Sequence, residues 1–130
     1  MNRSEQREQA FILIFQSMFA DGVDEESLAL YSEVNGEIGE YANHLFSNVT
    51  EKTEELDEYI SKFSNGWKIK RIPKVNVAIL RLAIYEMKYE NDVPVSVAIN
   101  EAVELAKKYS GKEDASFING ILGSVSRSDI

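Results

Sequence analysis

Residues 67–89 of the chain read WKIKRIPKVNVAILRLAIYEMKY, residues 93–109 read VPVSVAINEAVELAKKY, and residues 117–123 read FINGILG. In all three segments apolar side chains recur with the spacing of an amphipathic helix that buries one face. Pro73 and Pro94 stand at the start of two helical patterns, where proline is tolerated because its missing N–H would have had no partner. These stretches therefore predict three consecutive helices separated by short breaks.

The first half of the chain also has helical patterns and no strand-like alternation. We expect a helix over residues 4–20, a short one over residues 24–34 and a long one over residues 38–63. At 1.5 Å per residue, the long helix would extend about 39 Å. Asp114 is a candidate N-cap for the last helix, because its carboxylate can accept hydrogen bonds from the first amides of a helix.

The helix expected over residues 73–89 is apolar almost all round, which indicates that more than one of its sides is covered. We expect it to be the central buried helix. A chain of 130 residues is long enough to bury a core of its own. The pattern as a whole predicts an all-α fold of six to seven helices around a single core or two small adjoining cores, within one domain over residues 1–130.

Composition narrows the class of protein. The chain has no cysteine, which excludes disulfides, thiolate metal ligands and thiol nucleophiles. Its start lacks the pattern of a cleaved signal, and no apolar run is long enough to span a membrane. We therefore expect a cytoplasmic protein that does not associate with a membrane.

The net charge of −8 is unevenly distributed along the chain. Residues 21–63 carry twelve acidic side chains against two basic ones, whereas residues 64–130 carry ten basic against eight acidic. Four of these bases fall within seven residues: Lys68, Lys70, Arg71 and Lys74. Because phosphate binding depends on local rather than total charge, this segment is a candidate phosphate-binding face. The alternative is a set of separate, solvated side chains.

Catalytic and metal-binding patterns are weak. His44 is the only histidine and has no patterned partner, so the simplest interpretation is an ordinary helix residue. The glycines of GILG, residues 120–123, lie within a helical segment and do not form a phosphate-cradling loop. We expect a protein that is not an enzyme and that uses no metal or cofactor.

Phe117 is the aromatic residue of the last helical segment. It follows the polar loop of residues 110–116, where it could stack on an unpaired base. A core position is the alternative, because the same residue fits the apolar face of the last helix.

Three further residues suggest contacts with another protein. Glu86 lies on the apolar stripe of the central helix, where a carboxylate needs an internal partner such as Arg71 or Arg81, or a contact with another chain. Phe15 and Phe19 lie on the less core-like side of the first helix. They either pack within the fold or form an apolar docking patch.

The order of these motifs resembles that of the NusB family of bacterial transcription antitermination factors. Three motifs carry the resemblance: AILRLAIYEM at residues 78–87, INEAVELAKKY at residues 99–109 and FINGIL at residues 117–122. Arg3 and Arg7 match the basic start of the family. The resemblance extends over the whole chain, and it is closer in residues 67–123 than in residues 21–63.

The resemblance implies a non-catalytic, all-α protein of two small helical bundles. Members of the family pair with NusE, a protein of the small ribosomal subunit, and the pair binds the boxA element of nascent RNA, notably ribosomal RNA. The assembly then joins an antitermination complex on RNA polymerase. The expected partners are therefore boxA-type single-stranded RNA, a NusE-like ribosomal protein and the polymerase complex.

The resemblance also implies roles for individual residues. The RNA surface would include Arg3, Arg7, Asp114 and Phe117. Phe15 and Glu86 would face the NusE-like partner, with Phe19 on the same docking patch. The family's arginine-rich start is sparse here, because three non-basic residues separate the two arginines. This departure predicts weaker RNA binding by the chain alone and greater dependence on the partner.

Other functions fit the same sequence. A protein-only helical module would use Glu86 and the apolar patch without useful RNA affinity. NusB-like domains also occur attached to RNA cytosine methyltransferases, but these 130 residues contain no catalytic domain or cofactor loop, so that function would need a separate chain. A homodimer that covers the cationic face and the apolar patch is also compatible with the sequence.

Overall fold

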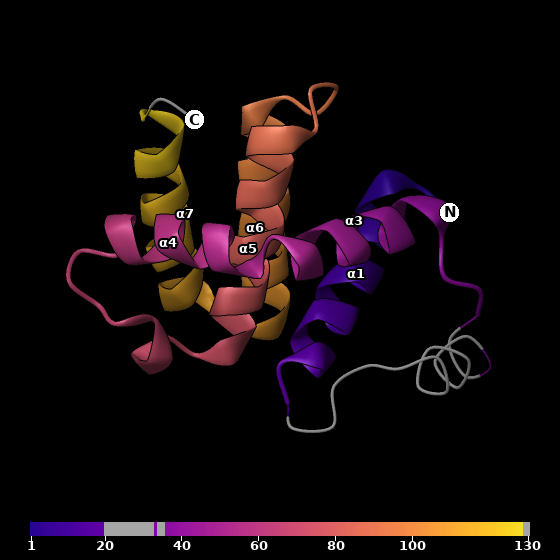
Figure 1. Ribbon diagram of the computed structural model, residues 1–130, viewed down its shortest axis with the longest axis horizontal. Helices are drawn as coiled ribbons and strands as arrows, with labels where there is room; N and C mark the ends of the chain where they lie inside the picture. Colours follow the sequence, from indigo (N-terminus) through magenta and orange to yellow (C-terminus); the bar gives the residue numbers. More distant parts are fainter. Residues whose placement is uncertain (20–32, 34–35, 129–130) are drawn as a thin grey trace. The chain divides into compact units, whose positions relative to one another are not determined.

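The computed structural model describes residues 1–19, 33 and 36–128. Most of these residues are helical and none of them forms a strand, which confirms the all-α fold class (Figure 1). The short helix expected over residues 24–34 falls outside the described residues, apart from residue 33. The described elements are α1 (Arg3–Ser17), α3 (Glu40–Glu51), α4 (Thr53–Phe63), the 3-10 helix η1 (Ile69–Arg71), α5 (Lys74–Tyr89), α6 (Val95–Tyr109) and α7 (Lys112–Ser126).

The chain divides into two compact units, residues 1–51 and residues 52–130. In the first unit α1 packs against α3. Burial of apolar surface is the main force that holds such helices together. The buried apolar residues of these two helices are Ala10, Phe11, Leu13, Ile14, Ala42, Leu45 and Val49.

Two glutamines of α1 supply hydrogen-bond acceptors at the start of α3. Gln6 Oε1 accepts hydrogen bonds from the backbone N–H groups of Tyr41, at 2.9 Å, and Ala42, at 3.3 Å. Gln9 Oε1 accepts another from the N–H of Gly39, at 2.9 Å. Because the first amides of a helix have no acceptor within that helix, these side chains stabilise the start of α3 from a neighbouring element.

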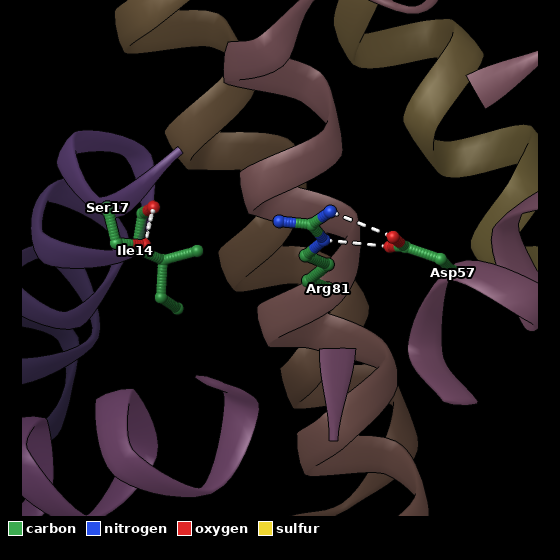
Figure 2. Close-up of polar contacts among 4 residues, drawn as sticks. All are labelled: Ile14, Ser17, Asp57 and Arg81. Atoms are coloured by element: carbon green, nitrogen blue, oxygen red, sulfur yellow. Dashed lines mark hydrogen bonds and ion pairs between the residues drawn. The ribbon is translucent and has the colours of Figure 1, made fainter. Parts of the chain in front are cut away.

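The second unit is built around α5. This helix packs against α4, α6 and α7, and α6 packs against α7. Eleven of its sixteen residues are buried, which confirms the prediction of a central buried helix. Arg81 of α5 donates two hydrogen bonds to the carboxylate of Asp57 on α4, at 2.7 and 2.8 Å, as Figure 2 shows.

Two predicted helix boundaries are wrong. The helix expected over residues 38–63 is divided into α3 and α4 at Lys52, whose φ of −104° and ψ of 16° depart from helical values. The β-branched residues Thr50 and Thr53 flank this break, and such side chains lose χ1 freedom in a helix. The last helix begins at Lys112, so Asp114 lies in its first turn and Gly111 is the N-cap.

The ends at Asn65, Pro73 and Pro94 agree with the sequence signals, whereas the first helix, expected to reach residue 20, ends at Ser17. Asn65 and Gly66 follow α4 with φ values of 52° and 86°, the left-handed conformation that favours these residue types. Pro73 and Pro94 are the N-caps of α5 and α6. The first helix ends at Ser17, where the hydroxyl donates to the carbonyl of Ile14 at 2.6 Å (Figure 2).

Candidate nucleic-acid interface

Trp67 and Phe117 form an aromatic pair in the second unit. Their ring centroids are 6.3 Å apart and the rings are inclined at 75°, an edge-to-face arrangement. Trp67 is 53% exposed, which is unusual for so large an aromatic side chain. The two rings line a hollow of about 300 Å³, which Asp114 and Arg71 also line. Two residues expected at an RNA surface, Asp114 and Phe117, therefore lie in one hollow.

The same hollow is lined by Asn76 of α5, which is 0% exposed. Ser110 Oγ lies 2.9 Å from Asn76 Oδ1 and 2.5 Å from Asp114 Oδ2, and its single proton can be donated to only one of them. Within the described part of the chain, Asn76 Nδ2 has no hydrogen-bond partner. Turning the amide by 180° places Nδ2 as a donor to Ser110 Oγ and leaves the Ser110 proton for Asp114, so these three side chains make one internal polar cluster between α5 and the start of α7.

A second hollow shares Trp67 and Arg71 with the first. It has a volume of about 400 Å³ and is also lined by Lys68 and by the turn of Asn65 and Gly66. All four bases of the basic segment, residues 68–74, are exposed. The expected cationic segment therefore stays open to solvent and adjoins an aromatic hollow.

Arg3 and Arg7 lie on α1, in the first unit. The Cζ atom of Arg3 is 3.7 Å from the centroid of the Tyr41 ring, and that of Arg7 is 5.9 Å from it. Arg3 is exposed, so it presents a cation to solvent over an aromatic face. Arg7 is only 5% exposed, which leaves little of its surface for a phosphate.

Phe15 and Phe19 continue an aromatic row that begins at Phe11. The centroids of Phe11 and Phe15 are 6.2 Å apart, and those of Phe15 and Phe19 are 5.1 Å apart. Phe15 is half-buried and Phe19 is 48% exposed. Both rings therefore retain apolar surface that another protein could cover.

Glu86 lies on α5 and is 1% exposed. Arg81, one of the two arginines considered as its internal partner, is engaged with Asp57, and the other, Arg71, is exposed. A carboxylate buried to this degree does not present a contact surface to a second protein. The predicted role of Glu86 in binding a partner protein therefore stays a prediction. If Glu86 has such a role, it acts indirectly, through the residues that cover its side chain.

A polar cluster connects α4 and α5 in the second unit. Tyr89 donates to the carboxylate of Glu55 at 2.5 Å, and this hydrogen bond raises the pKa of Tyr89. Lys88 donates to the hydroxyl of Tyr59 at 2.8 Å, which raises the pKa of Lys88. The two hydrogen bonds stabilise the protonated forms of Tyr89 and Lys88. The cluster is therefore suited to holding α4 against α5 and not to proton transfer at neutral pH.

His44, the only histidine, is exposed on α3, and its Nδ1 atom is 3.3 Å from Asn48 Nδ2. Among the residues that the structure describes, no group of three or more histidine, aspartate or glutamate side chains could hold a metal ion. No helix in that same part of the chain has the length and apolar character needed to cross a membrane.

Sequence reasoning missed three residues that shape these surfaces. Trp67 adjoins the basic segment and could have been recognised as an exposed aromatic among cations. Asn76 interrupts an apolar helix, which is the signal that singled out Glu86. Tyr41 lies within the helix expected over residues 38–63, and nothing in the sequence pattern indicated that Arg3 would stack on its ring.

The model of the NusB family matches residues 4–127 of the chain. The transcription antitermination protein NusB of Acetivibrio thermocellus is 51% identical to it, over 96% of this chain and 88% of that protein. A crystal form of T. maritima NusB has a TM-score of 0.84 at 30% identity, covering 98% of this chain and 92% of that one. A chain in a crystal structure of a plectonemic RNA supercoil has a TM-score of 0.87 at 26% identity, covering 96% and 94%. The chain belongs to the NusB family.

Proposed function

We propose that this protein is an RNA-binding antitermination factor that pairs with a NusE-like ribosomal protein and binds boxA of nascent ribosomal RNA. In this role it works in the cytoplasm on the RNA polymerase antitermination complex and catalyses no reaction. The observation that carries the proposal is family membership over residues 4–127, in a family whose relatives are transcription antitermination proteins. The exposed aromatic and cationic surface around Trp67 gives the proposal a physical basis.

RNA contact is assigned to three of the four predicted residues, Arg3, Asp114 and Phe117, and a supporting role to the fourth, Arg7. Single-stranded RNA is recognised through splayed bases that stack on aromatic rings and through phosphates that pair with cations. Phe117 in its hollow suits the first kind of contact and the exposed Arg3 suits the second. Arg7 is buried, so we assign it the role of holding Tyr41 beneath Arg3.

Contact with the NusE-like partner is assigned to the row of Phe15 and Phe19. Covering such exposed rings is favourable, and aromatic residues are enriched where proteins associate. Glu86 is buried, so in this proposal it keeps the surface of α5 in shape for the partner and does not touch it.

The two binding events should reinforce each other. A net charge of −8 and few exposed arginines give weak, salt-sensitive binding to RNA by the chain alone. When a bound partner adds its own RNA-binding surface, RNA held by one protein meets the other within the same complex. This raises the apparent affinity of the pair for RNA. By linkage, RNA must then tighten the protein pair by the same factor.

Titration of labelled boxA RNA tests the proposal. The protein is titrated with and without the NusE-like partner, at two salt concentrations, against boxA and a scrambled RNA of the same composition. We expect tight binding only with the partner, a preference for boxA and a loss of affinity at the higher salt. Equal affinity for boxA and scrambled RNA in every mixture would refute the proposal.

A protein-only interaction module is the second candidate function. The burial of Arg7 and the acidic net charge favour it, because both reduce the cationic surface available to RNA. The same titration decides between the two functions: partner binding that RNA neither strengthens nor requires would identify the protein-only module.

A further inference from the structure

We propose that the Asn65–Gly66 pair is a site of spontaneous deamidation, a covalent modification that converts a neutral amide into a carboxylate beside the basic segment. The sequence has three asparagines that a glycine follows: Asn35, Asn65 and Asn119. The first lies outside the described residues. The structure separates the other two, because one is in an exposed turn and the other is inside a helix.

The reaction needs only the two residues and water. The backbone nitrogen of Gly66 attacks the side-chain carbon Cγ of Asn65, so that a bond forms between them while the bond from Cγ to Nδ2 breaks. The proton of the attacking nitrogen and the side-chain amino group leave together as ammonia, and a five-membered succinimide ring remains. Water then opens the ring at either carbonyl, which gives aspartate or isoaspartate. The net change is the uptake of one water and the release of one ammonia.

Asn65 and Gly66 are the two central residues of a turn between α4 and η1. Their φ values of 52° and 86° fit a type I′ turn, which favours asparagine followed by glycine. The hydrogen bond that closes the turn joins the N–H of Trp67 to the carbonyl of Ser64 at 3.1 Å. This bond therefore does not use the attacking nitrogen, which belongs to Gly66.

The ends of the turn are held, whereas its central peptide group is exposed. Ser64 is 0% exposed, and its Oγ lies 2.7 Å from the carbonyl oxygen of Trp67. Asn65 and Gly66 are both exposed, and a Cβ atom at Gly66 would meet nothing within 4 Å. Glycine has no side chain to hinder the attack, and its backbone rotates more freely than that of other residues. Ring closure therefore requires rotation of one exposed peptide group and no disruption of the core.

Asn119 and Gly120 provide an internal comparison. They have the same residue types and are also exposed, but they lie inside α7. Within a helix φ and ψ are fixed, and the backbone N–H donates to the carbonyl four residues earlier. The succinimide ring cannot form in that conformation, so α7 has to open locally before Asn119 reacts. Residue type and exposure are thus matched in the two pairs, and the backbone conformation is what differs.

Deamidation of Asn65 would change the charge of one hollow. Asn65 lines the hollow that Lys68 and Arg71 also line. A carboxylate there opposes the two cations, which leaves less positive charge in the basic segment for phosphate. This consequence rests on the proposed function, whereas the reaction itself needs no RNA.

Peptide mapping by mass spectrometry tests the modification. The purified protein is incubated at neutral and at mildly alkaline pH, folded and in guanidinium chloride, and conversion is followed separately in the peptides that contain Asn35, Asn65 and Asn119. In denaturant, Asn65 and Asn119 should convert at similar rates. In the folded protein, Asn65 should convert faster than Asn119 by roughly tenfold or more, because the opening of α7 adds to the barrier. The rate at Asn65 should rise with pH, because the attacking nitrogen has to lose its proton.

The comparison of folded and unfolded protein decides the outcome. If folding slows Asn65 as much as it slows Asn119, the turn gives no access to the reaction and the modification site is refuted. Asn65→Gln is the matched variant, because its longer side chain would have to close a six-membered ring. Conversion at residue 65 should fall sharply in this variant, while conversion at Asn119 stays unchanged.

Asn65→Asp tests the consequence for RNA without waiting for the reaction. Aspartate tolerates the left-handed conformation, so the melting temperature should not change. With the NusE-like partner present, the variant should bind boxA RNA a few-fold more weakly, with a smaller slope of log Kd against log salt. Asn91→Asp is the control, because it adds the same charge at an exposed position outside this hollow.

The outcomes separate the modification site from the proposed function. If both aspartate variants bind boxA as the wild type does, the consequence for RNA is refuted and the modification site stands on the peptide mapping. If the wild type does not distinguish boxA from scrambled RNA, the proposed function is refuted and the modification site again stands or falls on the mapping.

Discussion

Arg3 and Arg7 stand one turn apart on α1, yet their exposures give them separable roles. Arg3 is exposed, so Arg3→Ala should weaken RNA binding a few-fold, reduce its salt dependence and leave the melting temperature unchanged. Arg7 is 5% exposed, so Arg7→Ala should lower the free energy of unfolding by about 1–3 kcal/mol and affect RNA through that loss. Filter binding at several salt concentrations and urea unfolding measure the two effects.

Arg127→Ala is the control for the two arginine substitutions. Arg127 is exposed at the end of α7, in the second unit. It should change neither RNA affinity nor stability appreciably. If Arg7→Ala lowers RNA affinity without any loss of stability, Arg7 meets the RNA directly despite its burial.

The tyrosines and the lysine at the end of α5 predict an alkaline limit to stability. The hydrogen bond to Glu55 raises the pKa of Tyr89 above 10.0, the bond to Tyr59 raises that of Lys88 above 10.5, and burial raises that of Tyr85. A group whose pKa rises on folding stabilises the fold fully below its unfolded pKa, and this contribution is lost as pH rises through the folded pKa. The free energy of unfolding should therefore fall above about pH 10.

Tyr89→Phe tests this pH dependence. The variant should be less stable than the wild type by about 1 kcal/mol at neutral pH, because it loses one hydrogen bond. The difference between them should shrink above about pH 10, where Tyr89 ionises in the unfolded wild type. Urea unfolding at a series of pH values measures both effects, and a difference that is constant with pH would contradict the assignment.

At the residue scale, the assignment of Phe117 and Asp114 to RNA stays a prediction. The structure places both residues in α7, where they line one hollow. Burial is not a local property, because helices remote in sequence decide it. Arg7 and Glu86 have the residue types of contact sites, but their neighbours in space cover them.

At the element scale, Gly39 lies against the Gln6 side chain of α1 just before α3 begins. A Cβ atom at this position would lie 2.2 Å from Gln6 Oε1, the atom that accepts hydrogen bonds from Tyr41 and Ala42. Gly39→Ala should therefore displace Gln6 and uncap α3, at a cost of about 1–2 kcal/mol in the free energy of unfolding. Thermal or urea unfolding followed by circular dichroism measures this cost.

Gly120→Ala is the matched control for Gly39→Ala. A Cβ atom at Gly120 would meet nothing within 4 Å, and the residue lies inside α7. Alanine there should stabilise the protein by about 0.5–1 kcal/mol, because glycine is the weaker helix former. Two Gly→Ala changes with opposite signs would attribute the loss at Gly39 to the displaced Gln6. A neutral Gly39→Ala would show that Gln6 does not cap α3.

Helix existence followed from periodicity, whereas two helix boundaries did not. Residues 38–63 keep one apolar stripe throughout, so the pattern predicted one helix and gave no sign of the break at Lys52. The break coincides with the boundary between the two compact units and is flanked by the β-branched Thr50 and Thr53, whose effect on helix propensity is too weak to be read as a helix end. The start of the last helix was also predicted wrongly: its N-cap is Gly111, whose φ of 131° favours glycine.

At the scale of the whole molecule, the single domain expected from the sequence has a direct test in unfolding cooperativity. The first unit is residues 1–51, and a unit of this length is close to the lower size limit for a stable independent fold. We therefore expect the two units to unfold together. Trp67 is the only tryptophan and belongs to the second unit, so its fluorescence reports that unit, whereas far-ultraviolet circular dichroism reports both.

Coincident urea transitions by fluorescence and circular dichroism would establish one cooperative domain. An earlier transition by circular dichroism alone would mean that α1 and α3 unfold while the second unit persists. The Gly39→Ala variant makes the comparison of the two transitions more decisive. The substitution lies in the first unit, so it changes the Trp67 fluorescence transition only if the two units unfold together. In a cooperative domain, Gly39→Ala shifts both transitions equally. In a divided one, it shifts the circular dichroism transition and leaves the fluorescence transition in place.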